Sequence, residues 1–257
     1  GRAAGMASKR NRPAETDLRK LKVLAHTFLE LDIEPTKISP LVVKHPFTDN
    51  GIVGIRKEDG NITVADLTSD PTSLRVWREQ CGRLIDNAEK PFEIFQMITN
   101  PYKLAFLKHA APFLSEQDTA LFLSQAWIIT EAPNADPNLS KRELLSLFRS
   151  VDPQKLMDEE EYGLFCGLDD VVTVYRGVTT YNAQNVKALS WTLNRDIAEW
   201  FAHRFGEHGT VYETQIPKEH ICAVFLGRNE AEVIVDPKHL LDIAPVQEQG
   251  EVFEQSM

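Results

Sequence analysis

The period of the hydrophobic pattern changes along the chain, and this change limits the fold classes open to it. In the first part of the chain, apolar residues recur mainly at the three- and four-residue spacing of amphipathic helices. In the last third, short apolar runs alternate with turn residues, as in strands. The helices expected in the first part cover residues 18–31, 74–88, 91–98, 102–113, 116–131 and 140–148. A helix-rich front and a strand-rich back predict an α+β fold.

Three short β-like runs interrupt the helical part, at residues 41–43, 52–55 and 62–65. They are separated by Asn50-Gly51 and Asp59-Gly60, dipeptides typical of tight hairpin turns. A small β-meander is therefore expected near residues 40–67. Residues 133–137 read as a loop, and the acidic run Asp158–Glu161 as a solvated helix start, where negative charge favours the helix dipole.

In the last third, strands are expected at residues 171–176, 188–192, 210–216, 221–225 and 231–235. A helix is expected between the second and third of these strands. Asn194 suits its N-cap and Gly206 the position after its last turn. An apolar stripe at helical spacing predicts the buried face of this helix: Ile197, Trp200, Phe201 and Phe205.

Composition narrows the range of functions. The 257 residues carry a net charge of −10, which disfavours a broad nucleic-acid footprint. The three cysteines are far apart and the seven histidines are scattered, so we expect no disulfide framework and no metal site. No run is apolar enough for a membrane span or a signal peptide, which predicts a cytoplasmic protein. Residues 1–5 read as a cloning remnant before Met6.

Glu230 and Glu232 stand two residues apart at the start of an apolar run, so a strand would place both on one face. At about 7 Å separation and an effective dielectric near 20, the two carboxylates repel by about 2 kcal/mol. A site that handles positive charge would justify this cost. The alternative is an edge strand with solvated charges.

Three short motifs follow one another in the strand-rich part: Tyr175-Arg-Gly177, Ser190-Trp-Thr192 and Glu230-Ala-Glu232. Their order resembles the mono-ADP-ribosyltransferases of the Arg-Ser-Glu, cholera-toxin-like class, and the resemblance covers roughly residues 170–245. It implies an ADP-ribosyltransferase-like split β-sandwich with an NAD cleft at residues 161–257, behind a mostly helical region at 6–160. It also implies NAD as a substrate and no metal.

The resemblance assigns a role to each motif residue. Arg176 would grip the NAD pyrophosphate, for which its fork of donors is suited, and the backbone of Gly177 would hold the nicotinamide amide. Ser190 would brace the catalytic glutamate, with Thr192 as the second hydroxyl. Trp191 should face the core.

The two glutamates divide the chemistry under this resemblance. Glu232 would be the catalytic residue, bonding the ribose and stabilising its oxocarbenium ion, and Glu230 would face an arginine acceptor. Trp200 or Phe201 would stack on nicotinamide, although core packing is the commoner meaning of an apolar stripe. The turn at residues 224–229 would present the acceptor through Phe225 and Arg228.

The expected activity is transfer of ADP-ribose to an arginine of a cellular or host protein, by a toxin or effector acting in its own cytoplasm or that of a host. Alternatives are modification of RNA or DNA by an antitoxin-controlled toxin, NAD hydrolysis, and an inactive fold used as an interaction module. The helical region would bind a target or an antitoxin-like partner. Neither a GxGxxG fingerprint nor a basic recognition helix is found.

Overall fold

A computed structural model describes residues 12–129, 139–180 and 186–246. The chain divides into two compact units, unit 1 (Gly1–Ser140) and unit 2 (Lys141–Met257). The division falls earlier than the expected boundary after residue 160, because α7, α8 and α9 pack on strand β9 of unit 2. The loop expected at residues 133–137 lies outside the described residues.

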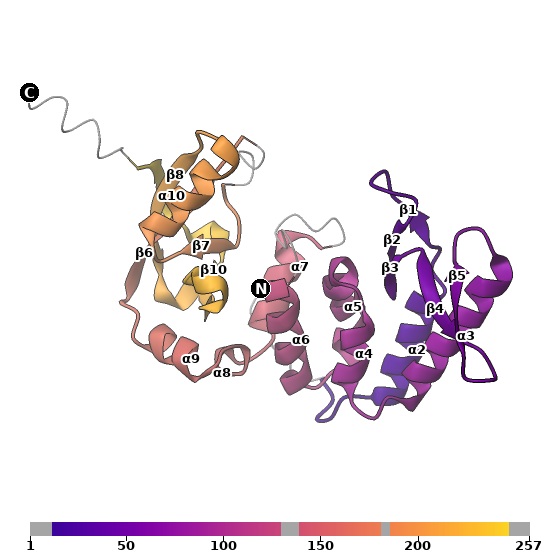
Figure 1. Ribbon diagram of the computed structural model, residues 1–257. Coiled ribbons are helices and arrows are strands. Elements are labelled where there is room, and N and C mark those ends of the chain that lie inside the picture. The colour runs from indigo at the N-terminus through magenta and orange to yellow at the C-terminus, as the bar shows by residue number, and fades with distance from the viewer. Residues whose placement is uncertain (1–11, 130–138, 181–185, 247–257) are drawn as a thin grey trace, which may run out of the picture. The chain divides into compact units, whose positions relative to one another are not determined.

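Unit 1 is built mainly from helices (Figure 1). Packing within this unit places α2 against α3, α4 and α5, and α6 against α4 and α5. The prediction of helices here is confirmed, with the bounds α2 Leu18–Leu29, α3 Pro71–Asn87, α4 Pro91–Met97, α5 Lys103–Ala110 and α6 Glu116–Ile129. Short 3-10 turns, η1 (Asn100–Tyr102) and η2 (Ala111–Phe113), flank α5.

The β region of unit 1 forms two small sheets rather than one meander. One sheet has the order β1-β2-β3, and a separate hairpin pairs β4 with β5. Asp59-Gly60 closes that hairpin as predicted, with Gly60 at a φ of 85°. The prediction for Asn50-Gly51 was wrong, because these residues carry the chain from one sheet to the other. The strands are β1 Glu34–Pro35, β2 Val42–His45, β3 Thr48–Asn50, β4 Ile52–Arg56 and β5 Ile62–Asp66.

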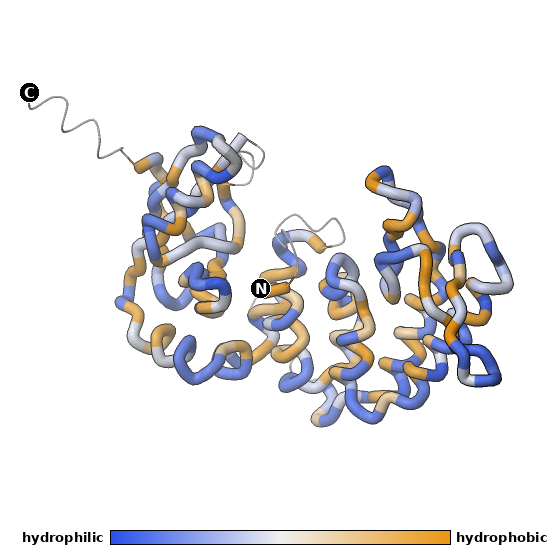
Figure 2. The backbone as a smooth tube through the Cα atoms, in the orientation of Figure 1, coloured by the Kyte–Doolittle hydropathy of each residue, from blue (hydrophilic) through white to orange (hydrophobic). Residues whose placement is uncertain are grey.

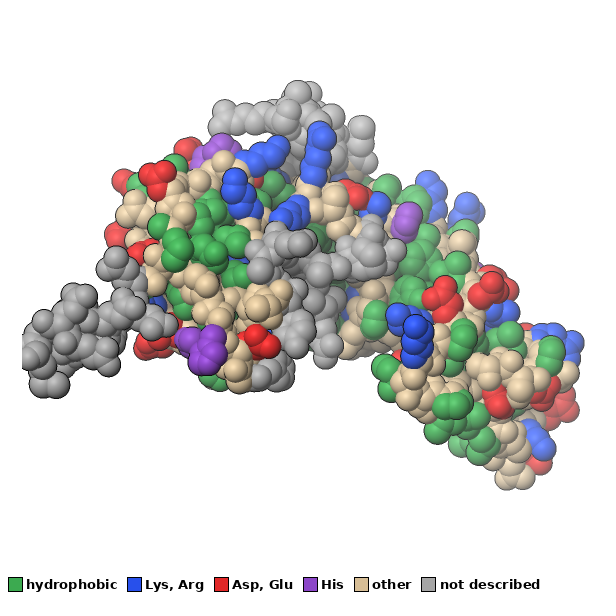
Figure 3. Space-filling model, turned by 90° about the horizontal axis from the view of Figure 1, so that it is seen from above, with side chains coloured by type: hydrophobic (Ala, Val, Ile, Leu, Met, Phe, Trp, Pro, Cys, Tyr) green, Lys and Arg blue, Asp and Glu red, His purple; other side chains and the backbone are tan. Residues whose placement is uncertain are grey.

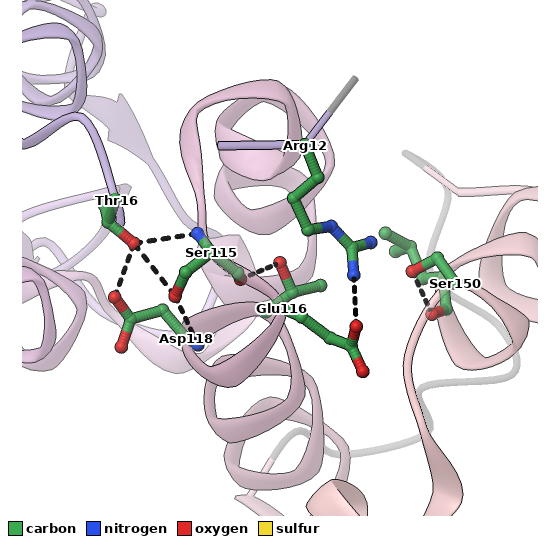
Figure 4. Close-up of polar contacts among 8 residues, drawn as sticks. Arg12, Thr16, Ser115, Glu116, Asp118 and Ser150 are labelled. Atoms are coloured by element: carbon green, nitrogen blue, oxygen red, sulfur yellow. Dashed lines mark hydrogen bonds and ion pairs between the residues drawn. The ribbon is translucent and has the colours of Figure 1, made fainter. Parts of the chain in front are cut away.

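The segment before α2 is fastened to the start of α6 by side chains (Figure 4). Thr16 Oγ1 donates to Asp118 at 2.5 Å and accepts from the backbone N–H of Ser115 at 2.9 Å. Arg12 lies 3.9 Å from Glu116. The bond from Ser115 satisfies one of the backbone N–H groups left without a helical partner at the start of α6.

Unit 2 begins with α7 (Lys141–Arg149), α8 (Pro153–Leu156) and α9 (Glu159–Cys166) and continues into a six-stranded antiparallel sheet of order β11-β8-β6-β7-β10-β9. Its helix α10 (Arg195–His203) follows β7, and Asn194 caps it as predicted. Gly206, at a φ of 71°, follows its last turn. The strands are β6 Val171–Val178, β7 Ser190–Thr192, β8 Thr210–Pro217, β9 Ile221–Phe225, β10 Glu232–Val235 and β11 Leu241–Pro245.

The two halves of this sheet meet at β6 and β7, where a single residue pair, Tyr175 with Thr192, is in register. By contrast, β6 pairs with β8 along its whole length. The strands therefore form one continuous sheet with a narrow junction, and the motif-bearing strands β6, β7 and β10 are neighbours.

Helix α10 packs on β6 and β8 through small residues. Ala198 and Ala202 are fully buried, whereas Trp200 is 63% exposed and Ile197 and Phe201 are partly exposed. Ile197, Trp200 and Phe201, the residues of the predicted stripe whose burial is described, are therefore not the buried face. A methyl group on Gly177 would overlap the carbonyl oxygen of Ala198, so the glycine allows the helix to lie directly on the strand.

Hydrophobic and hydrophilic stretches alternate along the backbone of both units (Figure 2). Helices and antiparallel sheets together make the protein α+β, as predicted. Among the residues that the structure describes, no helix is long and apolar enough to cross a membrane.

Candidate active site

The three motif residues Arg176, Ser190 and Glu232 lie on neighbouring strands β6, β7 and β10. Glu232 stands opposite Thr192, and Ile234 stands opposite Ser190, in the antiparallel pairing of β10 with β7. Residues opposite each other point to the same side of a sheet. Ser190 and Glu232 are thus diagonal neighbours on one face.

Side-chain contacts join the three residues. Ser190 Oγ donates a hydrogen bond to Glu232 Oε2. Arg176 Nη1 donates to the backbone carbonyl oxygen of Ser190 at 2.8 Å. The serine thus holds the carboxylate through its side chain and the guanidinium through its backbone.

Electrostatics make Arg176 unusual for a strand residue. Burial lowers the pKa of its guanidinium to about 10, and the carboxylate of Glu232 partly opposes this shift. Lys141, at the start of α7, donates from Nζ to the carbonyl of Lys187 at 2.8 Å. Burial and then the charge of Arg176 lower the pKa of Lys141. Two cations therefore lie within electrostatic reach of each other, an arrangement that favours an anion.

A tight turn places Glu230 just ahead of β10. The hydroxyl of Thr192 donates to the carbonyl of Glu230 at 2.7 Å, and the N–H of Leu193 donates to the carbonyl of Ala231 at 3.1 Å. Three residues of the turn have left-handed backbones, Arg228 (φ 61°), Asn229 (φ 55°) and Ala231 (φ 45°). Left-handed non-glycine residues cost about 1 kcal/mol or more each, so surrounding contacts must hold this turn.

Glu161 supplies one of those contacts. It is 7% exposed, although the sequence predicted a solvated carboxylate at the start of α9. Its Oε1 accepts from the N–H of Asp158 at 2.9 Å, completing a capping box, and its Oε2 accepts from the N–H of Leu226 at 2.7 Å. The prediction of a helix start was correct, but that of solvation was wrong because the side chain also anchors the turn.

Glu230 occupies a mixed environment. Burial raises the pKa of its carboxyl above the ordinary value, and the positive charges of Arg228 and Arg204 partly oppose this. Arg228 is exposed on the turn, as an acceptor contact would require. The same expectation for Phe225 was wrong, since it is 1% exposed inside β9.

The aromatic residues of α10 lie at the surface. The rings of Trp200 and Phe201 meet edge to face with centroids 5.0 Å apart, and the guanidinium of Arg204 lies 5.2 Å from the centroid of Phe201. Trp191 is 2% exposed and faces the core as predicted, with its indole N–H bonded to the carbonyl of Ala188.

A cavity of about 690 Å³ lies in unit 1, between α2 and α3, and its lining includes none of the motif residues.

Comparison of the chain with protein families, with curated proteins and with solved structures finds no match. The sequence indicates no role for Lys141 or Arg204, because each comes near the motif residues only through the fold. It also does not show that Glu161 reaches Leu226.

Proposed function

We propose that the protein is an NAD-dependent mono-ADP-ribosyltransferase that transfers ADP-ribose to an arginine of a target protein. The observation that supports this most strongly is the hydrogen bond from Ser190 to Glu232, with Arg176 bonded to the backbone of the same serine. A carboxylate held by a serine beside a held guanidinium suits a substrate that carries phosphates and develops positive charge on its ribose.

In this proposal each charge has a task. Arg176, with Lys141, binds the pyrophosphate of NAD. The bond between ribose C1′ and the nicotinamide nitrogen breaks, its electrons leave with neutral nicotinamide, and Glu232 stabilises the resulting oxocarbenium ion. The guanidinium of the acceptor attacks C1′, and Glu230 takes up the proton that it loses. The split β-sandwich and the NAD cleft belong to this same proposal.

A second candidate is transfer to RNA or DNA. The positive charges of Arg204 and Arg228 lie close enough to Glu230 to lower the pKa of its carboxyl against the effect of burial. Trp200 is exposed and its ring contacts that of Phe201. Seen from above, hydrophobic side chains gather next to Lys and Arg side chains on unit 2 (Figure 3). Aromatic side chains next to cations are typical of single-stranded nucleic-acid binding.

The protein-arginine acceptor is preferred because Glu230 offers a carboxylate in front of Glu232, and the net charge of −10 repels a phosphate backbone.

We further propose that unit 1 binds the target or an antitoxin-like regulator. Capture of binding proteins by the full chain but not by a chain lacking residues 12–129 would support this role, and equal capture by both would contradict it.

Labelling separates the proposals. Purified protein and its Glu232→Gln variant are incubated with NAD labelled in the adenylate and with a cell lysate, and the products are digested with protease or nuclease. Label that needs Glu232 and is released by protease supports transfer to protein. Label released by nuclease supports the second candidate. Absence of label together with absence of nicotinamide release would leave the interaction module as the better account.

A further inference from the structure

A separate cluster of polar side chains lies at the other end of β10 from Glu232. His220 ends the 3-10 turn η5 (Lys218–His220), Asp236 follows β10, and His239 ends η7 (Pro237–His239). One potential ligand atom from each lies within 4.8 Å of the others. The sequence predicted no metal site because these residues are scattered along it, and only the fold brings them together.

The strand pairing explains how they meet. β9 and β10 are antiparallel, and their register shifts between Ile234 and Val235. Such irregularities re-aim the side chains that follow them. After the shift, the N–H of Asp236 donates to the carbonyl of His220 at 2.9 Å, which sets these two residues side by side. The η7 turn then brings His239 back, with its N–H bonded to the carbonyl of Asp236 at 3.1 Å.

The side chains converge as well as the backbones. The imidazole rings of His220 and His239 stack with centroids 3.5 Å apart and planes 3° apart. His239 Nε2 lies 3.6 Å from Asp236 Oδ2, and the Asp236 side chain is 4% exposed. Arg149 Nη2 contacts the same oxygen at 2.5 Å, and the arginine side chain is half exposed.

We propose that His220, Asp236 and His239 bind a zinc ion. Two imidazoles and one carboxylate are a common zinc donor set, which leaves a fourth position for water. Zinc ligands at about 2.0–2.2 Å from the metal stand roughly 3.4 Å apart on a tetrahedron. The ligand atoms, now up to 4.8 Å apart, must therefore approach by up to about 1.4 Å. The two stacked rings must also tilt so that their nitrogens face one ion. His239 can provide this movement because its side chain is 46% exposed.

The proposed zinc lies apart from the transfer chemistry. Glu232 stands at the first position of β10 and Asp236 follows its last, so the ion would lie about 13 Å from the catalytic carboxylate at the rise of a strand. It would cross-link the ends of β9 and β10 by joining η5 to η7. Arg149, which now neutralises Asp236, would be released on binding.

The test is zinc titration of the full chain, without a histidine tag and freed of metal by a chelator. Calorimetry should give one zinc per chain, and zinc should raise the thermal midpoint by about 5 °C. A His220→Ala, His239→Ala double variant should bind zinc at least about 100-fold more weakly. Cobalt in place of zinc should give the visible absorption of tetrahedral coordination in the wild type only.

A matched control uses the other histidine pair of unit 2. The rings of His203 and His208 lie 6.4 Å apart at 76°, and both residues are exposed. The His203→Ala, His208→Ala variant should bind zinc like the wild type. If the first double variant does not fold, as judged by circular dichroism, His239→Gln replaces it and should also weaken binding. Absence of zinc binding by the wild type, or equal binding by the His220/His239 and control variants, would overturn the proposal.

Discussion

Ser190 and Glu232 lie diagonally across neighbouring strands, and the serine hydroxyl donates to the glutamate carboxylate. The bond depends on the pairing of β7 with β10, so the carboxylate is held in place by the sheet itself. Orientation before substrate binding is a large part of what an enzyme contributes to stabilising charge in a transition state. Under the proposed function, this contact should therefore govern the rate more than the affinity for NAD.

Removal of the Ser190 hydroxyl tests that expectation. Ser190→Ala should lower kcat for nicotinamide release about 10- to 100-fold, because a hydrogen bond to a charged group contributes about 1.5–3 kcal/mol. KM for NAD should change little. Ser190→Thr keeps a hydroxyl and should recover part of the rate. A Ser190→Ala variant with unchanged kcat would show that the contact does not position Glu232 for catalysis.

Glu230 should separate transfer from hydrolysis. Glu230→Gln keeps the shape of the side chain but cannot accept a proton, so transfer to a small guanidine such as agmatine should fall at least about 100-fold. Release of nicotinamide to water should persist, since Glu232 and Arg176 remain. Both products are measured by chromatography from one reaction. Equal loss of the two activities would contradict the division of roles between the glutamates.

The pH profile of transfer should report on Glu230. Burial raises the pKa of its carboxyl, so the carboxylate needed for transfer is lost at a higher pH than for an ordinary glutamate as the solution is acidified. Because Arg204 opposes that shift, Arg204→Gln should move the acid limb to still higher pH. The rate of transfer is measured between pH 4 and 8 for the wild type, for Arg204→Gln and for the surface control Arg142→Gln. These profiles show in which direction the acid limb moves. An acid limb that moves to lower pH in Arg204→Gln would refute the assignment.

Replacement by alanine should change the free energy of unfolding in opposite directions at two glycines of unit 2. In Gly177→Ala, the added methyl group meets the backbone of Ala198 and Ala202, which cannot yield without lifting α10 from β6. We expect a loss of about 3 kcal/mol in the free energy of unfolding. Gly163 lies within α9 with open space around it, so Gly163→Ala should stabilise by about 0.5–1 kcal/mol. Unfolding in urea measures the free energy of unfolding of both variants and of the wild type. An unchanged value for Gly177→Ala would contradict the close packing of α10 on β6.

Lys103 provides a pH test of unit 1. Its ammonium donates to the carbonyl of Phe95 at 2.8 Å, and burial lowers its pKa from 10.5 to about 8. Between these values the unfolded chain holds more protons than the folded one, so this lysine makes stability rise with pH in that window. The free energy of unfolding is measured from pH 7.5 to 10.5 for the wild type and for Lys103→Met. With increasing pH, it should rise less or fall more steeply in Lys103→Met than in the wild type. Identical slopes would contradict a buried, shifted lysine.

The sequence predicted local structure well where a residue acts on its own backbone. Asn194 caps α10, Asp59-Gly60 closes a hairpin, and the acidic run at Asp158 starts a helix, because each effect needs only a few neighbouring residues. It also predicted that Arg176, Ser190 and Glu232 come from separate strands. Their adjacency in the sheet is a finding of the structure, since strand order depends on packing along the whole unit.

The errors arise where tertiary contacts decide. Trp200 belongs to an apolar stripe, yet α10 turns Ala198 and Ala202 inward because Gly177 offers room for close approach. Glu161 is polar, yet it is buried because the N–H of Leu226 needs a partner. Neither partner is near in sequence, so no local pattern could show these contacts.

The most direct test of the proposed activity is nicotinamide release by purified protein. Wild type and Glu232→Gln are incubated with NAD, with and without agmatine, and Glu213→Gln serves as a control for an exposed carboxylate on the same sheet. The proposal predicts release by the wild type and by Glu213→Gln, and at least a roughly 100-fold lower rate for Glu232→Gln in a variant with unchanged thermal stability. No release by the wild type under either condition, or equal release by all three proteins, would contradict it.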